Sequence, residues 1–363
     1  MAVTTDCNLK CVYCFEDGIK KIKMPNINID QILKFFTENF KLETFTTASI
    51  TLYGGEPMVE TDLLLKLSES LKKLFEKYGV KLDLFLITNG TFFSEYAISK
   101  LVSSGLRGVQ VTIDGPREIH NQRRMYSNGV GTFDDIIKNI HELQKIVPAT
   151  SIRISIDKSN NYKRKVKNLI EFLKNEIDMS NVMIYLAPIV NTLSNDFTKK
   201  NHFTFNEAGT ILNEYYDYLL EIKINTLDET SLCPCIAHNA NGVVINSDGK
   251  LYNCISLIGR EKFEVGDIFK GFKPAYTKLL NINKWKECLK EACPFVPLCV
   301  GGCHFDSVVN HKDIMKRYCK SKIVSSQWLH ILKRNLEIKY GFICLRSLDK
   351  KNVKEILIDG GLI

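Results

Sequence analysis

Residues 7–16 of this 363-residue chain read CNLKCVYCFE, a short loop that contains Cys7, Cys11 and Cys14. Thiolate is a common protein ligand of iron in clusters, and a [4Fe-4S] cube has four iron corners. Three cysteines therefore leave one iron open to a further ligand. The alternative is half of a zinc site completed by a distant residue, but the C-x3-C-x2-C spacing differs from the C-x2-C pairs of zinc modules. The loop favours a cluster with one open corner.

Outward from this loop, short apolar segments alternate with longer amphipathic ones as far as about residue 225. We predict strands at Ala48–Gly54, Leu82–Thr88, Gly108–Asp114, Ser151–Asp157 and Val182–Pro188. We predict helices near 30–40, 61–78, 94–104, 133–146, 162–176 and 206–223. Strands that read as continuous apolar runs and are joined by helices indicate an α/β fold with a helix-covered parallel sheet, either a barrel or part of one. In such folds the functional loops follow the carboxyl ends of the strands.

The last third of the chain has a different composition. Eight of the twelve cysteines fall between Cys233 and Cys319, after a polar segment at 225–230. A β-hairpin is predicted in 241–254, with its turn at Asp248 and Gly249, and a helical pattern follows Cys319 to about residue 340. The predicted domains are therefore 1–225, 226–340 and a tail at 341–363.

Composition excludes several classes of protein. No apolar run approaches the roughly 20 residues of a membrane span, and the first residues lack a signal peptide, so we predict a cytoplasmic protein. Twelve cysteines in such a protein indicate metal binding more than disulfides. The net charge is +8, but the lysines and arginines are spread along the chain. They favour solvated helix faces over a nucleic-acid-binding surface.

Three loops at predicted strand ends carry groups suited to a polar ligand. In YGGEP, at 53–57, two glycines allow close approach of the backbone to a ligand, and Glu56 supplies an anion for an ammonium group. ITNG, at 87–90, offers small and amide groups suited to a ribose. TIDGPREIHNQRR, at 112–124, ends in Arg124, which can bind a carboxylate in a bidentate manner.

Taken in this order, the motifs of residues 7–124 resemble those of the radical S-adenosylmethionine (radical SAM) superfamily. The resemblance rests on the cysteine triad with Tyr13 before its last cysteine, then GGEP, TNG and DGP-x3-H-x3-R. It implies a partial (β/α)6 barrel in which Cys7, Cys11 and Cys14 hold a [4Fe-4S] cluster and SAM binds the fourth iron. It also implies the SAM-binding residues, which are Tyr13, Gly54, Gly55, Glu56, Asn89, Thr112 and Arg124.

The cysteine-rich part resembles the SPASM extension of that superfamily, which carries two auxiliary [4Fe-4S] clusters. The matching pattern is Cys235-x13-Gly249-x4-Cys254, then Cys293-x5-Cys299-x3-Cys303 and Cys319. It departs from the usual C-x2-C before the x5 spacing, because Cys288 gives C-x4-C. The resemblance implies one cluster on Cys233, Cys235, Cys254 and Cys303, and another on Cys288, Cys293, Cys299 and Cys319. Taken alone, eight cysteines fit two four-thiolate zinc sites equally well.

The resemblance implies an enzyme with SAM and three [4Fe-4S] clusters as cofactors. Such an enzyme cleaves SAM reductively and uses the 5′-deoxyadenosyl radical to modify a ribosomally synthesised peptide, by a thioether or a carbon–carbon crosslink. The alternative is an anaerobic sulfatase-maturing enzyme that makes formylglycine. Those enzymes are expected to carry aspartate after the cysteine of G-x4-C, where this chain has Ile255. An alternative of another class is a non-catalytic iron–sulfur or zinc module.

The expected partners are a precursor peptide and a reductant such as flavodoxin or ferredoxin. Only six residues precede Cys7, too few for a leader-binding domain. Leader recognition is then expected to fall to a separate protein or to the tail, or to be dispensed with, unless the true start of the chain lies further upstream.

Overall fold

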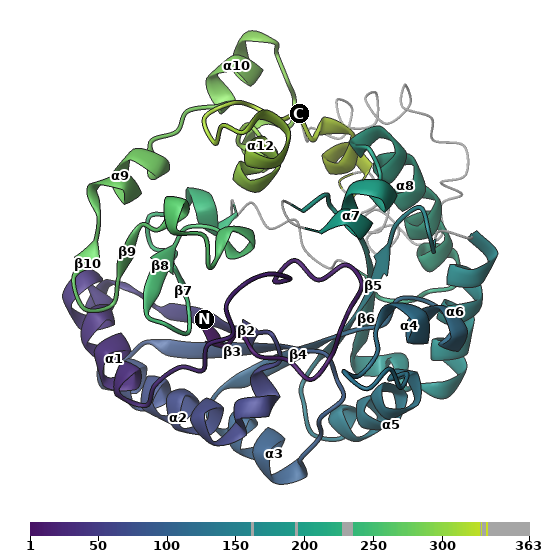
Figure 1. The fold of residues 1–363 in the computed structure, drawn as a ribbon, viewed down its shortest axis with the longest axis horizontal. Coiled ribbons are helices and arrows are strands. Elements are labelled where there is room, and N and C mark those ends of the chain that lie inside the picture. The colour runs from purple at the N-terminus through teal and green to yellow at the C-terminus, as the bar shows by residue number, and fades with distance from the viewer. Residues whose placement is uncertain (161–162, 193–194, 227–234, 327, 329–331, 333–363) are drawn as a thin grey trace.

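Six parallel strands form one curved sheet in the computed structural model, which describes residues 1–160, 163–192, 195–226, 235–326, 328 and 332 (Figure 1). Their spatial order follows the chain. The strands are β1 (Ala2–Thr4), β2 (Thr47–Gly54), β3 (Lys81–Thr88), β4 (Leu106–Thr112), β5 (Thr150–Ile156) and β6 (Val182–Pro188). The five predicted strands are thus confirmed, and β1 adds a short strand that pairs with the start of the GGEP loop.

Helices cover the outer face of this sheet (Figure 1). The six predicted helices are confirmed as α1 (Ile27–Asn39), α2 (Thr61–Lys77), α3 (Glu95–Ser103), α5 (Phe133–Gln144), α6 (Lys163–Glu176) and α8 (Phe205–Glu221). The starts of two of them are set by side chains: Ser94 accepts a hydrogen bond from the Ala97 amide, and Thr204 forms a capping box with Glu207. The short helices α4 (Arg117–Arg123) and α7 (Asp196–Asn201) were not predicted.

The strands bury one face beneath the helices, whereas their other face is less buried and mixes apolar side chains, such as Phe85 and Ile87 of β3, with polar ones. Along β5, the side chains of Ile152, Ile154 and Ile156 are fully buried in the core beneath the helices. Because successive side chains of a strand point to opposite faces, the residues between them line the inner face of the curve. That face carries polar side chains such as Gln110 and Arg153, which are both only partly buried.

A second, antiparallel sheet follows in the cysteine-rich part, with the order β10-β9-β8-β7. Its strands are β7 (Val244–Ile245), β8 (Lys250–Tyr252), β9 (Gly266–Asp267) and β10 (Gly271–Phe272). The hairpin prediction is confirmed: Asn246 donates to the Lys250 carbonyl (2.9 Å), and Gly249 in the turn has φ +84. Short helices that the sequence did not reveal follow, namely α9 (Pro274–Leu280), α10 (Trp285–Lys290), α11 (Val296–Cys299) and α12 (His304–His311).

Some predictions fall partly outside the described residues. Residues 321–326 are helical, as predicted after Cys319, whereas the rest of that helix to residue 340 lies beyond the described part of the chain apart from 328 and 332. Cys233 and the segment that follows the predicted boundary at 225 lie outside it as well. The domain limits therefore stay predictions.

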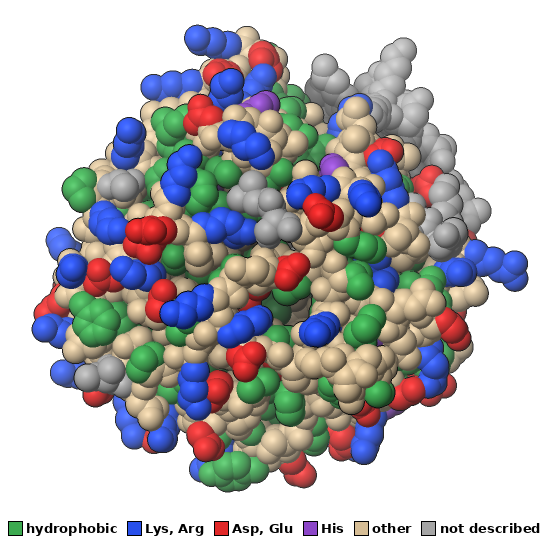
Figure 2. All heavy atoms as spheres, in the orientation of Figure 1, with side chains coloured by type: hydrophobic (Ala, Val, Ile, Leu, Met, Phe, Trp, Pro, Cys, Tyr) green, Lys and Arg blue, Asp and Glu red, His purple; other side chains and the backbone are tan. Residues whose placement is uncertain are grey.

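The two sheets meet through an apolar cluster beside the N-terminus. Tyr53, at the end of β2, packs with Ala2 and with Val244, Tyr252 and Ile258 of the cysteine-rich part. This contact places the hairpin next to the GGEP loop. None of the helices in the described part of the chain combines the length and the apolar composition that a membrane span requires. On the face drawn in Figure 2, basic and acidic side chains are interspersed.

Candidate active site

The GGEP glycines hold the cysteine loop against the end of β2. Gly55 donates to the Thr4 carbonyl (3.0 Å) and Glu56 to the Asp6 carbonyl (2.8 Å), directly before Cys7. A Cβ atom on Gly54 would lie 1.9 Å from the Thr4 carbonyl oxygen, and one on Gly55 would lie 2.2 Å from that of Asp6. These glycines therefore permit a close approach to the chain's own backbone, and their contact with a ligand stays a prediction.

Replacing Gly55 with alanine is expected to displace this loop, because the new methyl group would overlap the Asp6 carbonyl. We expect loss of about four irons per chain and of SAM cleavage, measured by iron analysis and 5′-deoxyadenosine formation. Gly108→Ala is the matched control, since a Cβ there meets only Phe85 at 3.4 Å and the Ala149 carbonyl at 3.6 Å. Equal behaviour of the two variants would contradict this role of Gly55.

The triad cysteines are partly buried thiols that lie beside the ends of the strands. The Leu9 amide donates to the Cys7 sulfur (3.4 Å), and the Asn89 side chain lies 3.8 Å from the same sulfur. Burial raises the pKa of the Cys7 thiol to about 11 and that of Cys14 to about 12. Iron binds thiolate, so binding a cluster here would release protons from these thiols.

Glu56 joins the ends of β2 and β3 from a fully buried position. Its carboxylate accepts hydrogen bonds from the Met58 amide (2.9 Å), the Thr88 hydroxyl (2.8 Å) and the Asn89 amide (2.6 Å). Burial raises the pKa of the Glu56 carboxyl, although these hydrogen bonds act to lower it. The side chain of Asn89 in turn donates to Asn8 in the cysteine loop (2.8 Å). Contacts of Glu56 and Asn89 with SAM stay predictions, and both residues also order the loop.

Arg124 and Tyr13 form a chain of polar contacts that reaches Asp114, just beyond the end of β4. Arg124 donates to the Tyr13 hydroxyl (2.9 Å), which donates to Asp114 (2.8 Å). The pKa of Arg124 is raised although burial lowers it, because Cys11 and Tyr13 favour the cation. The Nε of Arg124 is buried and has no hydrogen-bond partner. The guanidinium therefore retains a free donor, which suits a carboxylate group.

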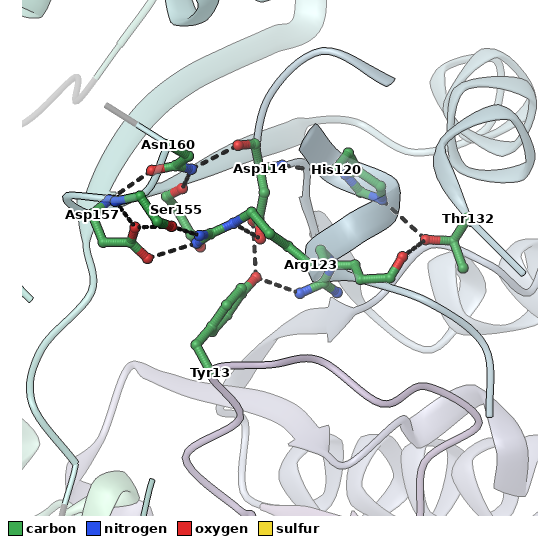
Figure 3. A network of polar contacts seen from close by, with 10 residues as sticks. Tyr13, Asp114, His120, Arg123, Thr132, Ser155, Asp157 and Asn160 are labelled. Atoms are coloured by element: carbon green, nitrogen blue, oxygen red, sulfur yellow. Dashed lines mark hydrogen bonds and ion pairs between the residues drawn. The ribbon is translucent and has the colours of Figure 1, made fainter. Parts of the chain in front are cut away.

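The neighbouring Arg123 has a different task, which the sequence did not reveal. It donates to Asp114 (3.1 Å) and to Asp157 (2.9 Å), and all three side chains are buried. Its guanidinium also lies 5.0 Å from the centre of the Tyr13 ring. Figure 3 shows how this cluster joins the segments that follow β4 and β5, with Tyr13 beside it. A carboxylate at the end of each strand was the only sequence signal for it.

Four cysteines of the cysteine-rich part surround one cavity of about 130 Å³. They are Cys288, Cys293, Cys299 and Cys319, the set that the SPASM resemblance assigns to one auxiliary cluster. Arg317 also lines the cavity and donates to the Cys288 sulfur (3.5 Å) and to both oxygens of Glu291. The departure from the usual spacing at Cys288 is therefore accommodated by helix α10, which brings this cysteine to the cavity.

Cys235, Cys254 and Cys303 form a second group near the hairpin. Cys303 packs against the buried cluster that contains Cys254. Burial, together with the charges of Cys303 and Cys235, raises the pKa of Cys254 to about 12. Lys284 is buried nearby and donates to the Ser307 hydroxyl (3.1 Å). Burial lowers the pKa of Lys284 to about 8, against the opposing charges of Cys303 and Asp306. A buried cation beside three thiols suits an anionic group at this place.

Comparison with known proteins identifies the fold family. Residues 1–186 match the family profile described as the Radical SAM superfamily. The chain belongs to this superfamily. It is therefore a radical SAM enzyme, and SAM and an iron–sulfur cluster are the cofactors of its family.

Relatives and solved structures of this superfamily extend the match beyond the barrel. The chain is 27% identical over 350 residues to a cysteine-type anaerobic sulfatase-maturating enzyme of Clostridium perfringens, covering 88% of this chain and 92% of the relative. The structure of anSMEcpe with bound AdoMet and Kp18Cys peptide has a TM-score of 0.70 at 19% identity, over 94% and 98% of the chains. The structure of Streptococcus suis SuiB bound to precursor peptide SuiA has a TM-score of 0.62 at 17% identity. The match covers 88% of this chain and 74% of that one.

The residues of this radical SAM enzyme suit an iron–sulfur cluster by their chemistry. The ten cysteines of the described part are all free. Within that part, no three His, Cys, Asp or Glu side chains converge in a way that would hold a single metal ion. A four-iron cube binds each thiolate at a separate corner, so its cysteines need not converge on one point.

Two buried polar groups between the triad loop and the hairpin were missed by sequence reasoning. Glu16 is 2% exposed, and neither of its carboxylate oxygens has a hydrogen-bond partner. Burial raises its pKa to about 7. The hydroxyl of Tyr53 is also buried without a partner, and the charges of Glu16 and Cys254 both raise its pKa, after burial itself. The position of Glu16 directly after Cys14 and Phe15 of the triad loop was the only sequence feature that could have pointed to it.

Proposed function

We propose that this radical SAM enzyme modifies a side chain of a peptide or protein, with three [4Fe-4S] clusters bound to its three groups of cysteines. The observation that carries the proposal is the arrangement of these groups. A loop of only three cysteines lies at the carboxyl ends of the strands, and two further groups lie in a separate SPASM-like part. Relatives that act on peptides support the same substrate class, since anSMEcpe and SuiB have both been solved with peptides.

In this proposal each part of the site has a defined task. Cys7, Cys11 and Cys14 hold the first cluster. Arg124 binds the carboxylate of SAM with the donor that has no protein partner, and Tyr13 and Asp114 orient its guanidinium. Bound at the open iron, SAM supplies a 5′-deoxyadenosyl radical that removes a hydrogen atom from the substrate. The buried strand ends shield this chemistry from water.

The remaining site residues extend the same picture. Gly54, Gly55, Glu56 and Asn89 order the triad loop and contact the amino group and nucleoside of SAM together with Thr112. Cys235, Cys254 and Cys303, with Cys233 as fourth ligand, hold one auxiliary cluster. The four cysteines around the cavity hold the other. A small electron-transfer protein such as flavodoxin or ferredoxin supplies the electrons, and a precursor peptide, with or without a separate leader-binding protein, is the substrate.

For the bond that is formed, the environment of Ile255 favours a thioether or carbon–carbon crosslink. In formylglycine formation, an aspartate is expected directly after Cys254. Here Ile255 occupies that position and packs against the apolar cluster of Tyr53 and Tyr252. An isoleucine cannot accept a proton from a substrate cysteine, so the reaction expected of a sulfatase-maturating enzyme lacks its usual base.

Formylglycine formation is the second candidate, and one observation favours it. The charges of Glu16 and Cys254 both raise the pKa of Tyr53, after burial itself, and the Glu16 carboxylate is buried. A carboxylate is therefore available between the triad loop and the hairpin, although it comes from a different segment. The similarity to the sulfatase-maturating enzyme of Clostridium perfringens agrees with this reading.

The two reactions are separated by mass spectrometry of peptide products. The anaerobically reconstituted enzyme is incubated with SAM, a reductant and either a sulfatase-derived cysteine peptide or the short peptides encoded beside its gene. We expect an encoded peptide to lose two hydrogen atoms through a new internal bond. Conversion of the sulfatase peptide to an aldehyde, with every encoded peptide unchanged, would assign formylglycine formation instead. Failure to form 5′-deoxyadenosine under any condition would contradict both.

A further inference from the structure

Arg153 lies on the inner face of the sheet, at the level where β4 ends. Its strand neighbours Ile152 and Ile154 point into the helix-covered core, so its own side chain points to the inner face. In the strand register, Arg153 lies between Thr112 of β4 and Tyr185 of β6. Thr112 is the last residue of β4, close to the proposed SAM site. Arg153 thus lies beside the space that a substrate would enter.

The guanidinium of Arg153 has no hydrogen-bond or ion-pair partner among the described residues, in spite of its position. Its Nε is buried and makes no hydrogen bond, and no carboxylate among the described residues forms an ion pair with it. On the same face of β5, two residues or about 7 Å further along, the Ser155 hydroxyl is buried and equally without a partner. Buried donors without acceptors are costly, so two of them on one face indicate a missing acceptor.

The other arginines at this end of the sheet are already engaged. Arg123 is held by Asp114 and Asp157, and Arg124 is bonded to Tyr13 beside the triad. The neighbours of Arg153 on this face bond to each other: the Tyr185 hydroxyl donates a hydrogen bond to the side chain of Gln110. Arg153 and Tyr185 are register partners on neighbouring strands, and the charge of Arg153 lowers the pKa of Tyr185 against the larger effect of burial.

From this arrangement we propose that Arg153, with Ser155, binds a carboxylate of the peptide substrate inside the barrel. The inference rests on the proposed function, because it assumes that a peptide enters this space. The guanidinium would hold the carboxylate in a charge-assisted bond, and the Ser155 hydroxyl would donate a further hydrogen bond. The carboxylate belongs either to an Asp or Glu side chain or to the C-terminus of the peptide. Substrates with an acidic group at a fixed distance from the reacting residue are therefore selected.

Peptide selection with the reconstituted holoenzyme and SAM tests this inference. A displayed library of random peptides is selected on the wild-type protein and on the variants Arg153→Gln, Arg153→Lys and Arg107→Gln. Arg107 is the matched control, because it is an exposed arginine on β4 that pairs with Asp83. We expect Asp or Glu to be enriched at one position with the wild type and with Arg107→Gln. The enrichment should be lost with Arg153→Gln and retained in part with Arg153→Lys.

Four synthetic versions of a recovered peptide then measure the effect and locate the carboxylate. They carry the acidic residue or its amide, each with a free or an amidated C-terminus. Removing the recognised carboxylate should weaken binding to the wild type about tenfold or more, as expected for a hydrogen bond to a charged group, and should have little effect on Arg153→Gln. If affinity is lost when the acidic side chain becomes an amide, the side chain is the source of the carboxylate. If affinity is lost when the C-terminus is amidated, the C-terminus is the source.

Several results would overturn the inference. Peptides that bind without any acidic preference, or an acidic preference unchanged in Arg153→Gln, would overturn it and leave the proposed function in place. A weaker affinity of Arg153→Gln for SAM alone, with an unchanged peptide preference, would assign Arg153 to the SAM site instead. Failure of every peptide to bind the active holoenzyme would overturn the inference and the proposed function together.

Discussion

Cys11→Ala is expected to abolish formation of 5′-deoxyadenosine from SAM while leaving most of the iron in place. Cys11 is the central cysteine of the triad loop, and no other thiol of that loop can replace it in a three-cysteine site. We expect about eight irons per chain instead of about twelve, because the two proposed auxiliary clusters do not use this residue. Iron and sulfide analysis of the anaerobic protein, together with chromatography of the SAM cleavage products, measures both quantities.

Cys344→Ala is the control for this experiment, since the family resemblance assigns Cys344 to none of the three clusters. This variant should retain all of its iron and cleave SAM at the wild-type rate. Retention of SAM cleavage by Cys11→Ala would contradict the assignment of the triad. Loss of all iron from Cys11→Ala would instead contradict the independence of the auxiliary groups.

Arg123→Met is expected to produce the largest loss of stability among changes near the site. Removing the guanidinium would leave Asp114 and Asp157 buried and without their shared cation. Breaking a buried ion pair in this way costs about 3–5 kcal/mol in the free energy of unfolding. Methionine preserves much of the side-chain volume, so the loss reports mainly on charge. The midpoint of thermal unfolding, followed by circular dichroism, should fall well below that of the wild type.

Arg117→Met provides the matched comparison for Arg123→Met because both arginines belong to α4. Arg117 pairs with Asp134 at the surface, where the side chains are 53% and 61% exposed. Exposed pairs contribute little to stability, so the unfolding midpoint should hardly change. Similar unfolding midpoints for the two variants would mean that the buried cluster contributes no more to stability than the exposed ion pair does.

Much of the architecture was predictable because it depends on short-range patterns. The predicted strand at 182–188 agrees with β6 at both ends, and the Asp248-Gly249 turn forms the predicted hairpin. The alternation of strands and helices repeats locally along the chain, and each motif loop directly follows a strand. The spacing of Cys7, Cys11 and Cys14 is likewise a property of one loop. Such features are set by near neighbours in the chain.

The partners of individual site residues were decided only by the tertiary structure. Arg123 and Arg124 are adjacent in sequence, yet one pairs with two buried carboxylates and the other retains a free donor. Gly55 would be conformationally permissive in any loop. The group that it approaches in space, however, is the carbonyl of Asp6, which is distant in the sequence. The unpartnered donor of Arg153 likewise became visible only once the face of β5 was known.

The sequence by itself determined the cysteine triad, the order of the strand-end motifs and the alternation that builds the parallel sheet, because each depends on residue types at short spacings. The tertiary structure alone decided which buried groups are paired and which still lack a partner. Pairing depends on segments that are distant in sequence, such as the ends of β4 and β5 that meet at Arg123. Burial then makes each missing partner costly, which is why we propose that ligands bind at the unpaired donors of Arg124 and Arg153.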